Sequence, residues 1–306
     1  MSKIGFVTVT YSEPNQLLRL TKRLGSMFPG AKISAAHDFG QTHLDTKRFP
    51  DFVSFIHPYE KTKWGNISVI HAAMRALREL YEKDDPDWVV LLSGSDYPVT
   101  SADKILSELR TGSYDAYIDF REIIRPHGIS LSADNREASF NFTEPEWNAI
   151  GYDRYVAKLI NYPSLTRKLQ PKWRKIFIRH PWFAWPFHPF RTNLHCFGGE
   201  QWFTANRRTA HMLIDEYESG ERLIKHFSKC FIPEEGYYQT VICNGTGLRV
   251  SSNNKRYIDW GSGGGHPKLL GSADLPAIAA SGSHFARKFR PDDAALSLLD
   301  KLIEKK

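Results

Sequence analysis

The sequence contains little cysteine and no long hydrophobic run. Its 306 residues include three cysteines, Cys196, Cys230 and Cys243, an odd number at spacings that match neither a zinc site nor a disulfide framework. Free thiols and a reducing, cytoplasmic location are therefore expected. No stretch approaches the ~18 consecutive apolar residues of a membrane span, and the apolar run after Met1 is too short for a signal peptide. The composition predicts a globular protein with a sizeable core.

Several motifs of cofactor and nucleic-acid chemistry are also missing. The Gly-rich run at residues 261–265 lacks the Lys-Ser/Thr of a phosphate-binding P-loop, and the twelve histidines show no zinc-binding pair around a glutamate. No recognisable DNA- or RNA-binding signature is present. Neither a resident metal or cofactor nor a nucleic-acid partner is expected.

The charge surplus is concentrated in one segment. The chain carries 41 Lys and Arg against 34 Asp and Glu, a formal net charge of +7. Residues 154–199 contain no acid, nine basic residues and a dense aromatic cluster at residues 182–187. We interpret this segment as an insertion that contacts a glycan or an anionic membrane surface. A positive groove with stacking aromatics would also suit nucleic acid, which we consider the weaker alternative.

Hydrophobic periodicity indicates alternating strands and helices in the first 120 residues. Strands are predicted at residues 4–9, 32–36, 52–56 and 88–92, and helices at 15–27 and 68–81. The uniformly apolar run at 88–92 is typical of a central parallel strand that is buried on both faces. Further helices are predicted at 209–218, from Pro233 onward and from Pro291 to the end. This order predicts an α/β fold with a parallel sheet.

Asp96 is the first candidate for ligand binding, since ligand sites in such sheets form beyond the carboxyl ends of the strands. It follows the buried strand within Ser93-Gly94-Ser95-Asp96, so its carboxylate is expected to project into the cleft. The alternative is that Asp96 caps the turn before Tyr97-Pro98. No Asp-x-Asp metal-binding pair follows the strand, because the pair Asp85-Pro86-Asp87 lies before it.

Further charged residues are candidates for catalysis and for phosphate binding. Pro233 suits a helix start, which places Glu234 and Glu235 in the first turn. Such acids are ordinary at a helix start, but one that faces a cleft can act as a general base. Arg256, with Lys288 between flanking aromatics, could bind a diphosphate and neutralise its charge as it leaves.

Six short segments, taken in order, resemble the Core-2/I-branching enzyme family, glycosyltransferase family 14. This family includes β-1,6-N-acetylglucosaminyltransferases, peptide O-xylosyltransferases and plant glucuronosyltransferases. The similar segments are Trp64-Gly65-Asn66-Ile67-Ser68-Val69, Leu92 to Pro98, Gly199 to Phe203, Pro233 to Val241, Arg256 to Trp260 and Phe285 to Phe289. The resemblance implies a modified two-lobed nucleotide-sugar transferase fold, of the GT-A type, without a metal-binding Asp-x-Asp motif.

The resemblance also implies an inverting, metal-independent mechanism with roles for individual residues. The general base matches Glu235, and the diphosphate-binding Arg and Lys match Arg256 and Lys288. Asp96 would lie near the donor sugar, while Asp38 and Val9, at the ends of the first two strands, would lie at the donor nucleotide. Trp202 and Glu200 are acceptor-binding candidates, because sugars stack on aromatics.

Together these observations predict one glycosyltransferase domain over residues 1–290 and a terminal helix over 291–306. Within the domain we expect a nucleotide-binding half (1–120), the basic insertion (154–199) and a catalytic half (200–290). The substrates would be UDP-N-acetylglucosamine or UDP-xylose and a glycan or glycoconjugate acceptor, as in surface polysaccharide synthesis at the inner face of a membrane. The rival interpretation is a non-catalytic protein that binds nucleotide sugars or glycans.

Overall fold

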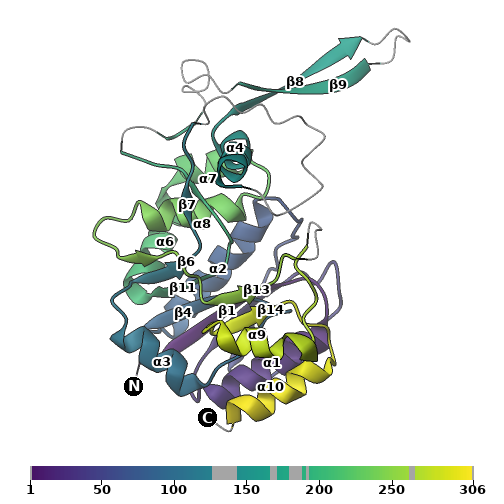
Figure 1. Ribbon diagram of the computed structural model, residues 1–306, viewed down its shortest axis with the longest axis vertical. Helices are drawn as coiled ribbons and strands as arrows, with labels where there is room; N and C mark the ends of the chain where they lie inside the picture. The colour runs from purple at the N-terminus through teal and green to yellow at the C-terminus, as the bar shows by residue number, and fades with distance from the viewer. Residues whose placement is uncertain are drawn as a thin grey trace.

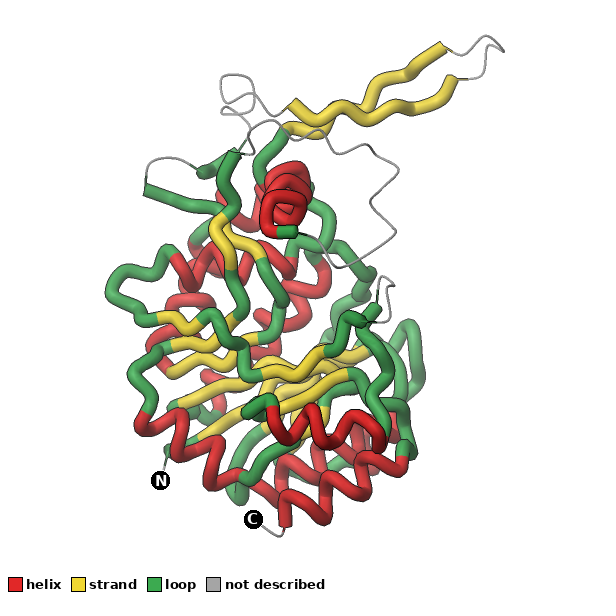
Figure 2. Tube along the Cα trace, viewed as in Figure 1, coloured by secondary structure: helices red, strands yellow, loops and turns green. Residues whose placement is uncertain are grey.

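A central seven-stranded sheet organises the computed structural model (Figure 1), and Figure 2 colours the same trace by secondary structure. The structure describes residues 2–125, 143–165, 171–178, 188–190, 193–261 and 266–304, without side chains for 158–165 and 171–178. In spatial order the strands are β12 (Val250–Ser251), β6 (Ala116–Ile118), β11 (Phe203–Asn206), β4 (Trp88–Ser93), β1 (Ile4–Thr10), β2 (Ile33–His37) and β3 (Val53–Phe55). The predicted α/β class is confirmed.

The sheet is mixed rather than wholly parallel. Strand β1 pairs in parallel with both β2 and β4, as the predicted strand-helix-strand units require. Strand β11, however, runs antiparallel to β4 and β6. The alternating side chains of β4 enter two different cores, Val89 and Leu91 on one face and Val90 and Leu92 on the other. The expected burial of this strand on both faces is therefore confirmed, and its expected wholly parallel surroundings are wrong.

Helices cover both faces of the sheet. One core lies under α2, α6 and α8, and the other under α1, α3, α9 and α10. The helices are α1 (Pro14–Met27), α2 (Ser68–Lys83), α3 (Ala102–Thr111), α4 (Glu144–Tyr155), α6 (Arg207–Ser219), α7 (Glu221–Phe227), α8 (Glu234–Cys243), α9 (Leu275–Ala280) and α10 (Ala294–Glu304). No helix in these described ranges is long and apolar enough to cross a bilayer.

Three smaller strand groups complete the fold. Strand β14 (Phe285–Arg287) lies between its parallel neighbour β13 (Arg256–Ile258) and its antiparallel neighbour β5 (Tyr97–Pro98). Strands β7 (Arg121–Glu122) and β10 (Phe197–Gly198) form an antiparallel pair. The hairpin of β8 (Lys158–Leu165) and β9 (Pro171–Ile178) extends from the top of the view in Figure 1. The pairing of β13 with β14 brings the two segments that carry Arg256 and Lys288 side by side.

The predicted boundary of the basic insertion at Arg154 falls inside α4. This helix begins earlier, because Thr143 and Glu146 form a capping box in which Glu146 accepts hydrogen bonds from the amide and hydroxyl of Thr143. The acid-free segment therefore starts in the last turn of a helix and continues into the β8–β9 hairpin. Its aromatic cluster at 182–187 lies outside the described residues. The three cysteines are free thiols, as expected.

Candidate functional site

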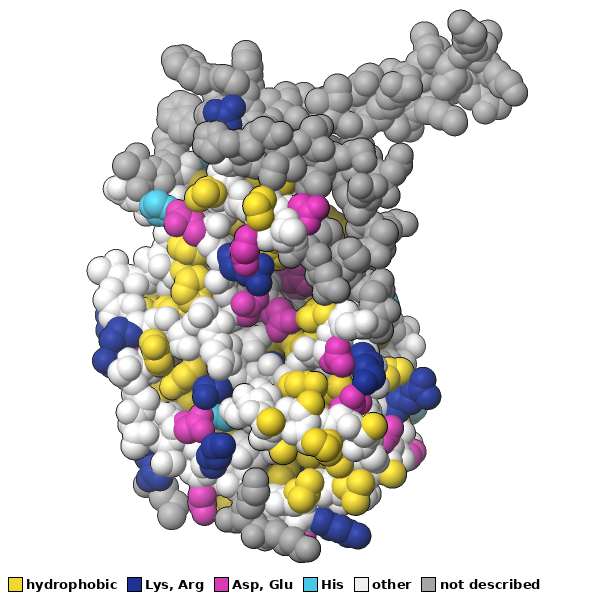
Figure 3. Space-filling view, in the orientation of Figure 1, with side chains coloured by type: hydrophobic (Ala, Val, Ile, Leu, Met, Phe, Trp, Pro, Cys, Tyr) yellow, Lys and Arg dark blue, Asp and Glu magenta, His cyan; other side chains and the backbone are white. Residues whose placement is uncertain are grey.

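Glu235 opens into a cavity bounded by α4, the start of α8 and the loop that leads into β13. The cavity has a volume of about 510 Å³, and its lining includes three carboxylates, two arginines and two indoles: Asp119, Glu200, Glu235, Arg121, Arg154, Trp147 and Trp260. On the face seen in Figure 3, acidic side chains gather around a hollow at mid-height. The size lies within the range of about 300–1,000 Å³ that is usual for small-molecule sites.

The Glu235 carboxylate is accessible and is paired with one arginine. Its side chain is 37% exposed, and Nη1 of Arg154 lies 3.3 Å from its Oε2. Burial raises the pKa of Glu235 to about 7; Arg154 opposes this rise, whereas Glu200 and Asp119 add to it. A carboxyl group with a pKa near neutrality is suited to accept a proton at physiological pH. The predicted base therefore has both an opening to a cavity and a suitable protonation range.

Close backbone packing holds Glu235 beside Glu200. The amide of Gly199 donates to the carbonyl of Glu235 at 2.9 Å. A Cβ on Gly199 would lie 2.2 Å from the carbonyl oxygen of Asp119, so no larger residue fits without moving that backbone. Glycine at this position lets three chain segments meet at the cavity floor.

Of the two predicted acceptor residues, Glu200 lines the cavity and Trp202 does not. Trp202 is 4% exposed and belongs to the core, where the guanidinium of Arg287 lies 4.1 Å from its ring centroid. The expectation that Trp202 presents its ring to an acceptor is not matched by this placement, because the residue lies on the inward side of the segment before β11. Trp260 supplies an indole to the cavity wall instead.

Asp96 does not project into the cavity. It is fully buried, and its carboxylate accepts hydrogen bonds from the amide and hydroxyl of Ser93 at 2.7 and 2.9 Å. Nε of Arg287 lies 3.0 Å from its Oδ1. The alternative interpretation, a carboxylate that caps the turn after β4, therefore describes its contacts. The expected projection is wrong because the turn folds the side chain back onto Ser93.

The Arg287–Asp96 ion pair gives a stability prediction. We expect Asp96→Asn to destabilise the fold by about 3–5 kcal/mol, since it leaves a largely buried arginine without its counter-charge. In a protein of this size that corresponds to a fall in Tm on the order of 10 °C, measurable by calorimetry. The control is Glu79→Gln, which removes an exposed pair with Lys83 of 2.6 Å and is expected to cost less than about 1 kcal/mol. Equal, small shifts for both variants would contradict the prediction.

Arg256 and Lys288 lie near Asp96 but have different surroundings. The guanidinium of Arg256 is buried, stacks over the ring of Phe285 and donates to the carbonyls of Leu91, Phe203 and Asn254. Burial lowers the pKa of Arg256 to about 10. Lys288 is half-buried, and burial together with the charge of Arg287 lowers its pKa.

Of the two predicted diphosphate ligands, Arg256 is thus on β13 and Lys288 directly follows the neighbouring strand β14, and the charge of Arg287 lowers the pKa of both. Arg256 is engaged by main-chain carbonyls, and the ammonium of Lys288 has no hydrogen-bond or ion-pair partner among the residues described. Arg287 also influences Glu200 and Glu235 electrostatically. The cation cluster and the carboxylate cavity are therefore neighbours, and direct contact of Arg256 with a donor stays a prediction.

Asp38 and Val9 lie where the sequence predicted, at the ends of β2 and β1. The carboxylate of Asp38 is buried and fully engaged: it accepts hydrogen bonds from the amide of Gly40, the side chain of Gln41, and both the amide and hydroxyl of Thr62. These bonds lower its pKa, although burial opposes them. Val9 is half-buried against the core. Asp38 therefore joins two loops, and its contact with a nucleotide stays a prediction.

Three site residues were missed from the sequence. Asp119 directly follows β6, so the rule that picked Asp96 would have found it had this short strand been predicted. Arg154 was interpreted as the start of a basic segment, and no local pattern shows that it reaches Glu235, 81 residues away. Arg287 lies beside Lys288 between the same flanking aromatics, and of the two only Lys288 was selected from the sequence.

Across the described ranges, no group of three or more His, Cys, Asp or Glu side chains could hold a metal.

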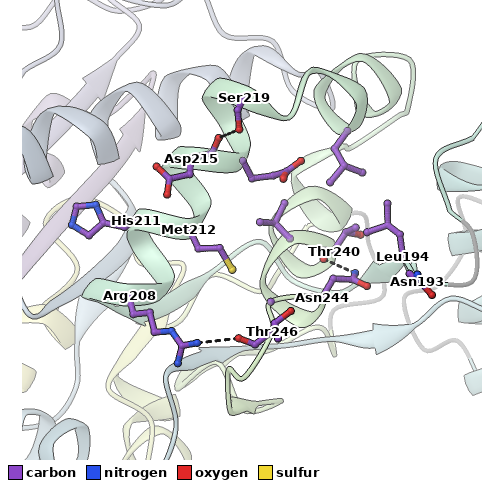
Figure 4. A pocket seen from close by; sticks show the side chains of 14 residues that line it. Asn193, Leu194, Arg208, His211, Met212, Asp215, Ser219, Thr240, Asn244 and Thr246 are labelled. Carbon is purple, nitrogen blue, oxygen red and sulfur yellow. Dashed lines mark hydrogen bonds between the residues drawn. The ribbon is translucent and has the colours of Figure 1, made fainter.

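A second cavity, of about 630 Å³, lies between α6 and α8 (Figure 4). Met212 and Leu194 contribute apolar surface, while Arg208, His211 and Asp215 lie toward its rim. None of the predicted site residues line it. It shares α8 with the first cavity but lies at the opposite end of that helix from Glu235.

Comparisons with known proteins identify the family. The model for "Branch: Core-2/I-Branching enzyme" matches residues 34–279, which is most of the chain. Two β-glucuronosyltransferases of Arabidopsis thaliana, GlcAT14B and GlcAT14A, are each 28% identical over 240 residues. These alignments cover 76% of this chain and 47% and 45% of the relatives, so the chain spans about half the length of the curated relatives it matches.

The family match makes the chain a member of a glycosyltransferase family. More specifically, the chain belongs to the Core-2/I-branching enzyme family, as the six segments indicated. Among solved structures, the bifunctional glycosyltransferase WbbM is 9% identical, with a TM-score of 0.41 over 98% of this chain and 51% of that one. A 4-diphosphocytidyl-2C-methyl-D-erythritol synthase from Anaerococcus prevotii is 8% identical, with a TM-score of 0.37 over 91% and 95%. Both scores describe a loose likeness only.

Proposed function

We propose that the protein is an inverting, metal-independent glycosyltransferase of the two-lobed GT-A type that transfers a sugar from a UDP-sugar to a hydroxyl of a glycan or glycoconjugate. The observation that carries the proposal is the placement of Glu235. Its carboxylate opens into a cavity of suitable size, and burial raises its pKa to about 7. A base on the rigid first turn of a helix can hold an acceptor hydroxyl in a fixed position.

In the proposed reaction the acceptor oxygen attacks the anomeric carbon from the face opposite UDP. Its bond to that carbon forms as the bond between carbon and the diphosphate oxygen breaks, and the hydroxyl proton passes to Glu235. An α-linked donor gives a β-linked product. Charge that develops on the departing diphosphate is stabilised by Lys288, whose ammonium has no other partner among the described residues, and by the field of Arg256 and Arg287. These cations take the place of a divalent metal.

The donor proposals are UDP-N-acetylglucosamine and UDP-xylose, on the strength of the sequence motifs. The names of the Arabidopsis relatives add UDP-glucuronate to the candidates. We further propose a cytoplasmic enzyme of surface polysaccharide synthesis that contacts an anionic membrane through its basic segment. The net charge of +7 and the nine basic residues of 154–199 support that contact.

A ligand screen tests the proposal. We expect one of these three UDP-sugars, and UDP itself, to raise Tm, because a ligand at 100 times its Kd stabilises the folded protein by about 2.7 kcal/mol. The rise in Tm should be equal with EDTA and with Mn²⁺ if the mechanism needs no metal. The same donor should release UDP when an acceptor glycan is added. Stabilisation only with Mg²⁺ or Mn²⁺ would contradict the metal-independent mechanism. Binding without turnover on a broad acceptor panel would favour the non-catalytic alternative.

A further inference from the structure

Glu200 forms hydrogen bonds with four other residues around the cavity. Its amide donates to the carboxylate of Asp119 at 3.0 Å, and its carbonyl accepts from Nε2 of Gln239 at 2.8 Å. Its side chain accepts from the indole Nε1 of Trp260 at 2.9 Å and from Nδ2 of Asn254 at 2.7 Å. The backbone of Glu200 is thus held between the end of β6 and helix α8, while both carboxylate oxygens hold the loop that leads into and out of β13.

The loop held by Glu200 is anchored at its other side by Arg256. Oδ1 of Asn254 accepts from the amide of Arg256 at 2.9 Å, and the carbonyl of Asn254 accepts from Nη1 of Arg256 at 3.0 Å. Arg256 in turn donates to the carbonyls of Leu91 on β4 and Phe203 on β11. A continuous chain of hydrogen bonds therefore joins the cavity wall to the central sheet through Glu200 and Asn254.

Trp260 is tied into this arrangement through its indole N–H, which donates to Glu200. It follows β13 at the edge of the cavity, beside residues 262–265, which lie outside the described ranges. A hydrogen bond from its indole N–H to a carboxylate is stronger and more directional than one to a neutral group, so it fixes the rotation of the ring. A fixed indole presents a flat apolar face on which a sugar ring can stack.

We propose that Glu200 is a positioning residue, which holds the loop of residues 252–260 so that Trp260 forms a rigid platform for the acceptor sugar. The inference rests on the proposed function, since it assigns the cavity to the acceptor. It differs from an acceptor-binding role for Glu200 itself, because both carboxylate oxygens already accept hydrogen bonds from the protein.

Glu200 has a second, electrostatic effect that a purely structural role would not produce. The charged groups that act on the pKa of Glu235 are Arg154 from α4, Asp119 after β6, Glu200 before β11 and Arg287 on β14, and its neighbour Glu234 in α8 interacts with it electrostatically. The negative charge of Glu200 raises the pKa of Glu235. Removing this charge therefore lowers that pKa, which extends the ionised form of the base to lower pH.

The experiment compares Glu200→Gln, Glu200→Ala, Trp260→Phe and the double variant Glu200→Ala/Trp260→Phe. Phe keeps a ring but cannot donate to Glu200. We expect Glu200→Ala and Trp260→Phe each to raise the acceptor KM about tenfold, as for a lost hydrogen bond to a charged group. If Glu200 acts through Trp260, the double variant also shows about tenfold rather than the hundredfold product. Glu200→Gln moves the acid limb of the pH profile to lower pH, and Trp260→Phe leaves it in place.

A readout that needs no activity keeps the two proposals separate. In the NMR spectrum, the indole N–H signal that disappears in Trp260→Phe belongs to Trp260. Hydrogen exchange at this N–H should be slow in the parent protein and faster in Glu200→Ala. Glu122→Gln, on neighbouring β7, is the control and should change neither the exchange nor KM. A double variant whose acceptor KM rises by about the hundredfold product of the two single effects overturns the positioning role of Glu200. So does an indole N–H of Trp260 that exchanges as slowly in Glu200→Ala as in the parent protein. Absence of any transfer by the parent protein refutes the proposed function, while the exchange measurement still decides the role of Glu200.

Discussion

Glu235→Gln should abolish sugar transfer while nucleotide binding persists. The amide has the size of the carboxylate but cannot accept the acceptor's proton, so we expect kcat to fall by about 10²–10⁴-fold, the usual contribution of a general base. The Kd for UDP, measured by thermal shift, should stay within roughly twofold of the parent value, since the contacts that bind the nucleotide do not involve the base. Transfer assays with the donor found in the ligand screen measure the first effect.

The adjacent acid provides a matched control for this variant. Glu234 lies in the same helical turn but is 4% exposed, and burial raises its pKa to about 8. It is therefore mostly protonated at pH 7, a state that glutamine mimics. Glu234→Gln should retain most of the activity. Full activity of Glu235→Gln would refute the base assignment, and equal loss in both variants would point to disruption of the helix start.

Much of the architecture follows from local sequence, and the departures have tertiary causes. Periodicity located α1, α2 and β4, because each carries a long apolar pattern that one period describes. Strand β11 has only four residues, and its antiparallel direction depends on the chain returning from the other side of the molecule. Helix α4 has apolar and polar residues all round, so only its capping box marks it. Short strands and helices without an apolar stripe carry too little local signal.

The site could be predicted where a residue's role depends on its own segment. Pro233 and two acids define a helix start that offered Glu234 and Glu235 alike; the family resemblance singled out Glu235, and that start does face a cavity. Asp96 and Trp202 were expected at the ligand, but both are buried and contact Arg287 instead. Asp96 is also held by its local turn through Ser93, the alternative that the sequence offered, but its ionic partner is nearly two hundred residues away, and the partner of Trp202 is 85 residues away. Pairings at such separations leave no trace in local sequence.

Arg154→Gln should make the reaction strongly dependent on pH. Arg154 lies 3.3 Å from Glu235 and favours its ionised form, so it holds the pKa of that carboxyl down to about 7. Without this positive charge the pKa rises, by about one unit if solvent screens part of the interaction, since an adjacent arginine usually lowers a carboxyl pKa by 1–3 units. The base is then protonated over a wider range. The ionised fraction of the base at pH 7 drops from about one half to about one tenth, so activity at pH 7 should fall roughly fivefold and recover near pH 9.

Measurement of kcat/KM from pH 5 to 10 tests this expectation, and Arg121→Gln is its control. Arg121 lines the same cavity, but it pairs with Glu144 at 3.1 Å and stacks over Trp147 rather than contacting the base. Its removal should leave the acid limb near pH 7. A loss in Arg154→Gln that is equal at every pH would contradict tuning of the base and assign Arg154 to substrate binding. A shifted limb would show that one ion pair between α4 and α8 sets the working range of the enzyme.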